Sequence, residues 1–119
     1  MIFICAEDIN AVYIHIKPVD FRKGIYGLGA HIAQEFTAKD GRPNLFVFIN
    51  RNRDKIRILY WDQSGYALWH KALQSERFKW PRRDTQEIVI TTQQLEYLLS
   101  GLNIDDLKPH KKLGASSFF

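Results

Sequence analysis

The chain has 119 residues, 45% of them hydrophobic and 25% charged, which fits one globular domain and excludes a largely disordered chain. Cys5 is the only cysteine, so an intrachain disulfide and a zinc site built from one chain's cysteines are excluded. Glu7 and Asp8 interrupt the apolar start, and no uncharged apolar run approaches about 20 residues, so we expect a cytoplasmic protein without signal peptide or membrane helix.

The first half of the chain predicts a strand, a helix and a second strand. Residues 11–17 alternate and are rich in β-forming side chains, and Pro18 ends them. Asp20 is the predicted N-cap of a helix whose apolar residues recur at helical spacing as far as Phe36, although three glycines weaken it. The run 45–49 is apolar at every position, which indicates a central strand covered on both faces.

The second half predicts a hairpin, a further strand or two and a final helix. A polar turn at 50–54 leads into a returning strand at 55–61. Residues 62–80 fit a helix or a strand, and we favour a strand that continues the meander. A short strand at 87–90 precedes a helix that begins with capping-box spacing at Thr91 and ends at Gly101.

These elements predict an α+β fold, with one antiparallel sheet of four or five strands and two helices packed on one face. We expect residues 1–109 to form this single domain. Residues 110–119 lack any periodicity and are expected to form a flexible tail.

Positive charge is concentrated in the middle of the chain. The formal net charge is +4, but residues 42–83 carry ten cations against three carboxylates, an excess of +7 that leaves −3 for the remainder. All three tryptophans fall in the same segment. A cationic segment with aromatic side chains suits a polyanion, because neutralised phosphates release counterions and bases stack on exposed rings.

The predicted contacts to nucleic acid lie in this segment. Cations expected to hold phosphates are Arg51, Arg53, Lys55, Arg57, Arg77, Lys79, Arg82 and Arg83. Trp61 and Trp80, each beside polar or charged neighbours, are expected to stack or wedge. The competing interpretation is that the cations form an ordinary solvated face and that the aromatic residues belong to the core.

No catalytic centre, metal site or cofactor is expected. Asp20, Asp62 and Glu76 could in principle gather a metal ion, but a helix cap, a turn and an exposed surface explain them as well. The four histidines lie in four different segments without the spacing of a metal site. The glycines of residues 24–29 match neither a phosphate loop nor a dinucleotide fingerprint.

Several motifs occur together and in order: DFRKG at 20–24, LFVFINRNRDK at 45–55, ILYWD at 58–62, LWHK at 68–71 and RFKWP at 77–81. From about Val12 to Leu102 the chain thereby resembles the TnpB-type accessory protein of the insertion sequence 66 family. One departure is Ala72, where that family often carries a basic residue. The resemblance implies a protein that is needed for transposition and is distinct from the catalytic transposase.

The expected function is that of an accessory DNA-binding component of a transposition complex. Its expected partners are the DNA of the element ends, the transposase and the other accessory protein encoded by the element, with no membrane involved. The alternative is an adaptor whose basic and aromatic surface docks on the transposase without touching DNA. A metal-dependent nuclease is the third hypothesis, and it would require Asp62.

Overall fold

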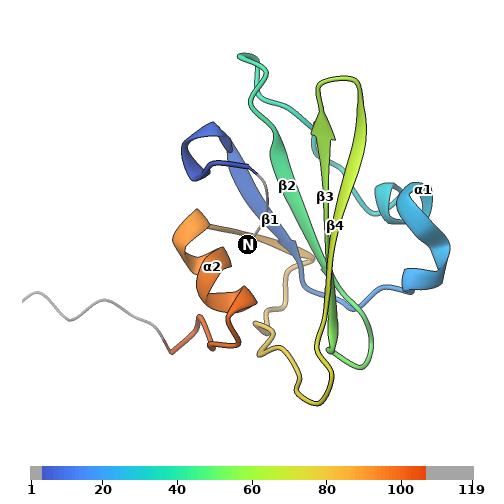
Figure 1. Ribbon diagram of the computed structural model, residues 1–119, viewed down its shortest axis with the longest axis vertical. Coiled ribbons are helices and arrows are strands. Elements are labelled where there is room, and N and C mark those ends of the chain that lie inside the picture. Colours follow the sequence, from blue (N-terminus) through green and yellow to red (C-terminus); the bar gives the residue numbers. More distant parts are fainter. Residues whose placement is uncertain (1–3, 107–119) are drawn as a thin grey trace, which may run out of the picture.

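A computed structural model describes residues 4–106 of the chain (Figure 1). The tail predicted at 110–119 lies outside the described residues. The described strands are β1 (Ala11–His15), β2 (Asn44–Ile49), β3 (Lys55–Asp62), β4 (Gly65–Ala72) and β5 (Glu87–Ile90). The described helices are α1 (Gly24–Gly29), α2 (Thr92–Leu99) and the short 3-10 turns η1 (Ala6–Asp8) and η2 (Phe21–Lys23).

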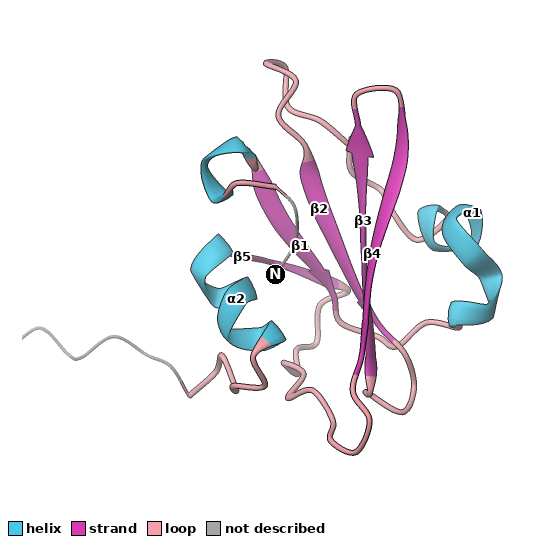
Figure 2. Cartoon of the chain, in the orientation of Figure 1, coloured by secondary structure: helices cyan, strands magenta, loops and turns pink. Residues whose placement is uncertain are grey.

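The five strands form one mixed sheet in the order β4-β3-β2-β1-β5 (Figure 2). β2, β3 and β4 make the predicted antiparallel meander, and β5 runs antiparallel to β1. β1 and β2 are parallel, with Val12 beside Leu45, so the expectation of a purely antiparallel sheet is wrong at this one pairing. The α+β class and the mostly antiparallel arrangement are confirmed.

β2 is the central strand that its uninterrupted apolar run predicts. All six of its residues are buried, because side chains alternate between the two covered faces of the sheet. Leu45, Val47 and Ile49 enter the larger core cluster, whereas Phe46 and Phe48 enter a smaller cluster on the other face.

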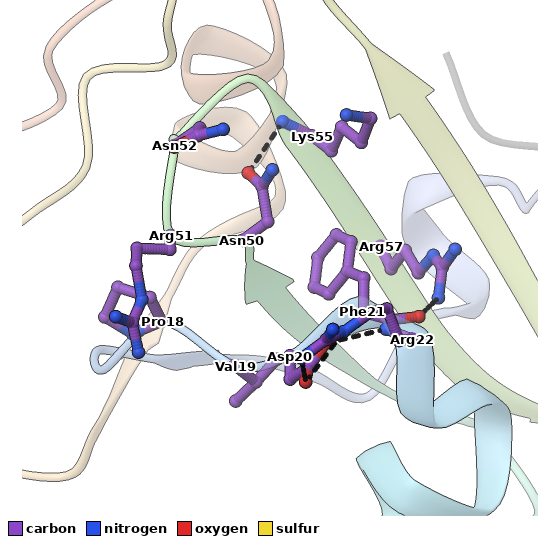
Figure 3. A pocket seen from close by; sticks show the side chains of 10 residues that line it. All are labelled: Pro18, Val19, Asp20, Phe21, Arg22, Asn50, Arg51, Asn52, Lys55 and Arg57. Carbon is purple, nitrogen blue, oxygen red and sulfur yellow. Dashed lines mark hydrogen bonds and ion pairs between the residues drawn. The ribbon is translucent and has the colours of Figure 1, made fainter.

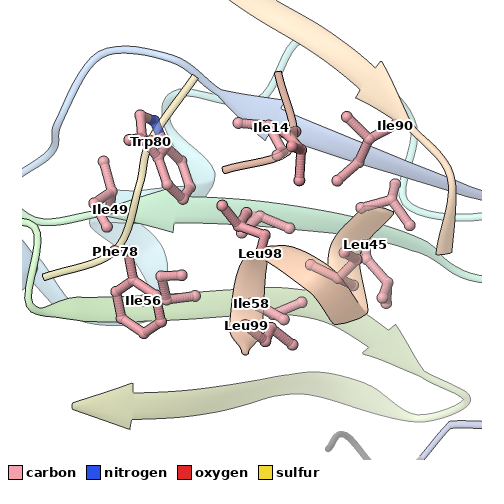
Figure 4. Close-up of a cluster of buried hydrophobic side chains, with 14 of the residues drawn as sticks. Ile14, Leu45, Ile49, Ile56, Ile58, Phe78, Trp80, Ile90, Leu98 and Leu99 are labelled. Carbon is pink, nitrogen blue, oxygen red and sulfur yellow. The ribbon is translucent and has the colours of Figure 1, made fainter. Parts of the chain in front are cut away.

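The two helices lie on opposite faces of the sheet, not on one face as predicted (Figure 1). Leu95, Leu98 and Leu99 of α2 pack on the larger cluster, which Figure 4 shows in close-up. Leu28 of α1 packs on the smaller cluster. Two helices are needed because each face of β2 is apolar and each must be removed from water.

The helix expected from Asp20 to Phe36 is much shorter than predicted. Asp20 does accept a hydrogen bond from the backbone N–H of Arg22, but it caps only η2. Gly24 then adopts a positive φ of 70°, which no helix interior tolerates, and α1 ends at Gly29. The glycines therefore separate two short turns whose apolar side chains still reach one cluster.

The start of α2 matches the sequence pattern. The Thr91 hydroxyl accepts from the N–H of Gln94, and the Gln94 side chain accepts from the N–H of Thr91. Gly101, with a φ of 92°, ends the helix in the left-handed region. Ile104 is buried beyond this stop, and it extends the apolar face of the helix into the following turn.

Candidate nucleic-acid interface

The topology brings three separate connections together at one end of the sheet (Figure 2). β1 and β2 are parallel, so the segments that follow them, 16–21 and 50–55, leave from the same end. β4 runs antiparallel to β3 and ends there too, and the connection 73–86 leads from it to β5. We call these three segments the basic end of the sheet.

The basic end concentrates the predicted contact residues. Its cations are Lys17, Arg51, Arg53, Lys55, Arg77, Lys79, Arg82 and Arg83. Its carboxylates are Asp20, Asp54, Glu76 and Asp84. Eight cations against four carboxylates give a formal excess of +4. The opposite end of the sheet, which we call the far end, consists of residues 6–10, 36–43 and 62–64. It carries two cations and four carboxylates, a formal excess of −2.

The β2–β3 turn at the basic end is held rigidly. The Asn50 side chain donates to the Asp54 carboxylate at 2.7 Å and accepts from the N–H of Lys55 at 2.9 Å. Arg53 adopts a left-handed φ of 62°, and its carbonyl accepts from the N–H of Phe78 at 2.7 Å. This last bond ties the turn to the connection 73–86, so the cations of the two segments keep a fixed relation.

A hollow of about 870 Å³ opens beside this turn, between it and the segment that follows β1 (Figure 3). Arg22, Arg51, Lys55 and Arg57 contribute its charged walls, and Asp20 is its one carboxylate. Hydrogen bonds from the side chain and the backbone of Arg22 hold the pKa of Asp20 well below its usual range. The lining therefore carries a net positive charge, as an anion site requires.

Three of the predicted cations are already bound within the chain. Arg57 donates to the Phe21 carbonyl at 2.7 Å and to His70 Nδ1 at 3.1 Å, and its guanidinium lies over the Phe21 ring. Arg83 makes a bidentate pair with the Asp105 carboxylate at 2.6 and 3.0 Å. Lys55 lies 3.7 Å from Asp54. Arg57 is therefore a structural clamp, which corrects the prediction that it is a free phosphate contact.

His70 accepts the hydrogen bond from Arg57 at Nδ1, which requires this nitrogen to carry no proton. Partial burial, followed by the positive charges of Arg57 and Lys55, lowers the pKa of His70. The lowered pKa favours the neutral His70 ring, and the neutral ring can accept the hydrogen bond from Arg57.

The remaining predicted cations make no ion pair with any residue between 4 and 106: Arg51, Arg53, Arg77, Lys79 and Arg82. All of them except Arg53, which is half-buried, are exposed. Arg53 and Arg82 share a second hollow with the exposed Lys17. These residues are free to meet an anion without first breaking a contact.

The structure does not place the two predicted stacking residues at this surface. Trp80 is only 6% exposed, lies in the larger core cluster and donates from Nε1 to the Ile16 carbonyl at 3.0 Å (Figure 4). The prediction that Trp80 is a contact residue is therefore wrong. Trp61 is half-buried at the far end, where its ring meets Tyr66 edge-on. Trp61 therefore cannot act together with the arginines of the basic end.

Sequence reasoning missed Lys17 and Arg22 as members of the site. Both follow β1, and their placement depends on the parallel pairing of β1 with β2. The sequence pattern around Trp80 does indicate that it is buried. Residues 77–80 alternate between charged and aromatic, and the structure exposes Arg77 and Lys79 while burying Phe78 and Trp80.

The carboxylates considered for a metal ion are not gathered. Asp20 and Glu76 belong to the basic end and Asp62 to the far end, and Asp20 is paired with Arg22 at 2.7 Å. Residues 4–106 contain no group of three histidine, cysteine or acidic side chains placed to hold a metal. Within the same range, no helix is both long and apolar enough to cross a bilayer.

Comparison with known proteins identifies the family. Residues 10–109 match the family described as IS66 Orf2 like protein. The chain belongs to this family. Membership implies an accessory role in transposition, and it confirms the resemblance of the sequence motifs to the TnpB-type protein of insertion sequence 66.

Two curated relatives come from Sinorhizobium fredii (strain NBRC 101917 / NGR234). The uncharacterized protein y4jC is 32% identical over 92 residues, which cover 77% of this chain and 79% of that protein. The uncharacterized protein y4hO is 33% identical over 92 residues, covering 77% and 80%. No solved structure matches the chain.

Proposed function

We propose that this IS66 Orf2-like protein serves transposition by binding the DNA of the element through the basic end of its sheet. The observation that carries the proposal is the gathering of eight cations from three segments, six of which form no ion pair within residues 4–106. Phosphate binding by such a surface needs no bound cofactor, because cations and released counterions supply the free energy.

The rigid turn supports the same function. Arg51 and Arg53 extend from a backbone fixed by hydrogen bonds at Asn50 and by the N–H of Phe78. Preorganised cations lose less conformational entropy on binding than cations on a loose loop. Arg77, Lys79 and Arg82 flank the turn from the connection 73–86, so phosphates on either side of it could be held.

Titration of duplex DNA from the element ends over a salt series tests this proposal. Five phosphate contacts predict a log–log slope of about −4.5, and the triple variant Arg51→Ala, Arg77→Ala, Arg82→Ala should reduce it to about −2. The matched control removes cations from the far end with Lys39→Ala and Arg42→Ala, and should leave the slope unchanged. Absence of binding at low salt, or equal losses in both variants, would contradict the proposal.

A second candidate function is that of an adaptor that docks on the transposase. Tyr26 favours it, because this α1 side chain is 85% exposed and tyrosine is enriched at the energetic centres of protein interfaces. Co-purification of the two proteins that survives nuclease digestion, and that Tyr26→Ala abolishes, would favour the adaptor. Association that disappears with digestion would favour DNA as the link.

A further inference from the structure

The outer edge of β4 is unusually open for the edge of a sheet. β4 is eight residues long, pairs with β3 without a bulge and contains no proline. Its one formally charged residue is Lys71, whose ammonium donates to the Leu99 carbonyl of α2 at 2.9 Å. The Lys71 side chain therefore points across the face of the sheet and not outward from the edge. Proteins usually protect such an edge by shortness, proline, a bulge or outward charges. The other edge strand, β5, has only four residues.

The register of the hairpin determines which backbone groups point outward. The N–H of Leu73 donates to the Asp54 carbonyl, so the pair Asp54–Leu73 is hydrogen-bonded, and every second pair along the ladder repeats this pattern. Ala67, Trp69 and Lys71 therefore direct their backbone groups to β3. The groups that face outward belong to Tyr66, Leu68, His70 and Ala72, and no residue from 4 to 106 hydrogen-bonds to them.

We propose that β4 pairs with β4 of a second copy of this chain, antiparallel and centred on Leu68. This register sets Leu68 opposite its own counterpart and Tyr66 opposite His70, so that only outward-facing residues exchange backbone hydrogen bonds. The two five-stranded sheets become one continuous sheet of two chains. The interface is self-complementary, as a two-fold symmetric dimer requires.

The side chains of β4 favour a second copy as the occupant. In the proposed register, Lys71 of each chain lies opposite Gly65, which carries no charge, and Ala67 lies opposite Trp69, a small residue against a large one. The facing pair Tyr66 and His70 is aromatic, and Tyr66 is 42% exposed in the single chain. No like charges oppose each other across the pairing, which is the feature that would destabilise it.

The dimer has a consequence for DNA that rests on the proposed function. In an antiparallel pair the two copies of β4 run in opposite directions, and β4 ends at the basic end. The two basic ends therefore face away from each other. One dimer would hold two separate DNA segments.

Sedimentation of the purified full chain over a concentration series tests the pairing without DNA. We expect the mass to rise from 14.0 kDa toward twice that value. Leu68→Lys and Leu68→Glu place like charges beside each other at the symmetry axis, and each variant alone should stay monomeric while keeping the circular dichroism of the folded chain. An equimolar mixture of the two should regain the dimer. A wild-type chain that stays at 14.0 kDa, or a mixture that does not associate, would overturn the proposal.

Proline variants provide a second test that does not depend on Leu68. Tyr66→Pro removes an outward N–H and leaves the ladder to β3 intact, so it should abolish the dimer. Val89→Pro is the matched control, because Val89 is 64% exposed and its N–H faces outward on the other edge. Loss of the dimer in Val89→Pro, or its survival in Tyr66→Pro, would place the interface elsewhere. Because no DNA is present, failure of the dimer leaves the DNA-binding test untouched.

Discussion

The two ends of the sheet are built from the same kinds of turn but carry different surfaces. Each contains a tight hairpin turn with one non-glycine residue in the left-handed region, Arg53 at the basic end and Gln63 at the far end. Each has a tryptophan nearby, buried Trp80 at the basic end and half-buried Trp61 at the far end. Only the basic end has several cations without an ion pair among the described residues, and the buried aromatic side chains of Phe78 and Trp80 lie beneath them. The contrast teaches that the cations face solvent because the aromatic residues between them are buried in the core.

The largest expected difference between the ends is in stability. Trp80→Ala should lower the free energy of unfolding by about 3–5 kcal/mol, because it leaves a large cavity and an unpaired Ile16 carbonyl. Trp61→Ala should cost about 1 kcal/mol, mainly through its edge-on contact with Tyr66. Urea unfolding of both variants gives the comparison. Equal losses of stability in the two variants would contradict the idea that the basic end rests on a buried aromatic side chain that contributes more than Trp61.

The two left-handed turn residues offer a finer comparison. Arg53→Gly and Gln63→Gly should each stabilise the chain by about 0.5–1 kcal/mol, because glycine adopts a positive φ without strain. Only Arg53→Gly removes a cation from the basic end, so it alone should weaken DNA binding and reduce the salt slope by about 1. Unfolding curves and DNA titrations of the same two proteins measure both effects. A loss of affinity in Gln63→Gly would show that the turns act through shape and not through charge.

The smallest expected effect is the pH dependence of the clamp beside the basic end. The pKa of His70 is lower in the folded chain than in the unfolded chain, so the unfolded state binds the proton more readily below about pH 6.5. The stability is therefore complete above that pH and declines as the pH falls through the folded pKa. His70→Gln removes this titration, so its melting temperature should fall less between about pH 7 and about pH 5 than that of the wild type.

The pKa of His31 is also lowered, by burial and then by the charges of His15 and Lys23, so part of the pH dependence should survive in His70→Gln. His31→Gln is the matched control for that remaining part. An unchanged pH profile in His70→Gln would contradict the assignment of a neutral His70 to the clamp.

Local signals in the sequence predicted most of the elements, because their causes are local. The capping residues of α2, the apolar run of β2 and the alternation in β3 each depend on neighbours within a few positions. The parallel pairing of β1 with β2 depends on residues 33 positions apart, such as Ala11 and Asn44, and no local pattern encodes it. The face that α1 covers depends on that pairing, because α1 lies in the connection between the two parallel strands.

The candidate site was predicted only in part, because some of its residues bind partners that are distant in the sequence. Arg51, Arg53, Arg77, Lys79 and Arg82 lie on turns and on a connection, where charge alone indicates exposure. Arg57 and Arg83 have equally charged side chains, but their partners Phe21 and Asp105 are distant in sequence. Charge counted along the chain cannot distinguish a free arginine from one that is already paired.

The position of β1 between β2 and β5 has a consequence for the order in which the chain is completed. Among the described strands β1 is synthesised first, yet Val12 pairs with Ile90 of β5, the last of them. The β2–β3–β4 meander uses only neighbouring segments and can form early, whereas β1 keeps one edge unpaired until β5 has been made. We therefore expect the nascent chain to be most prone to aggregation, and most dependent on chaperones, until residue 90 has left the ribosome.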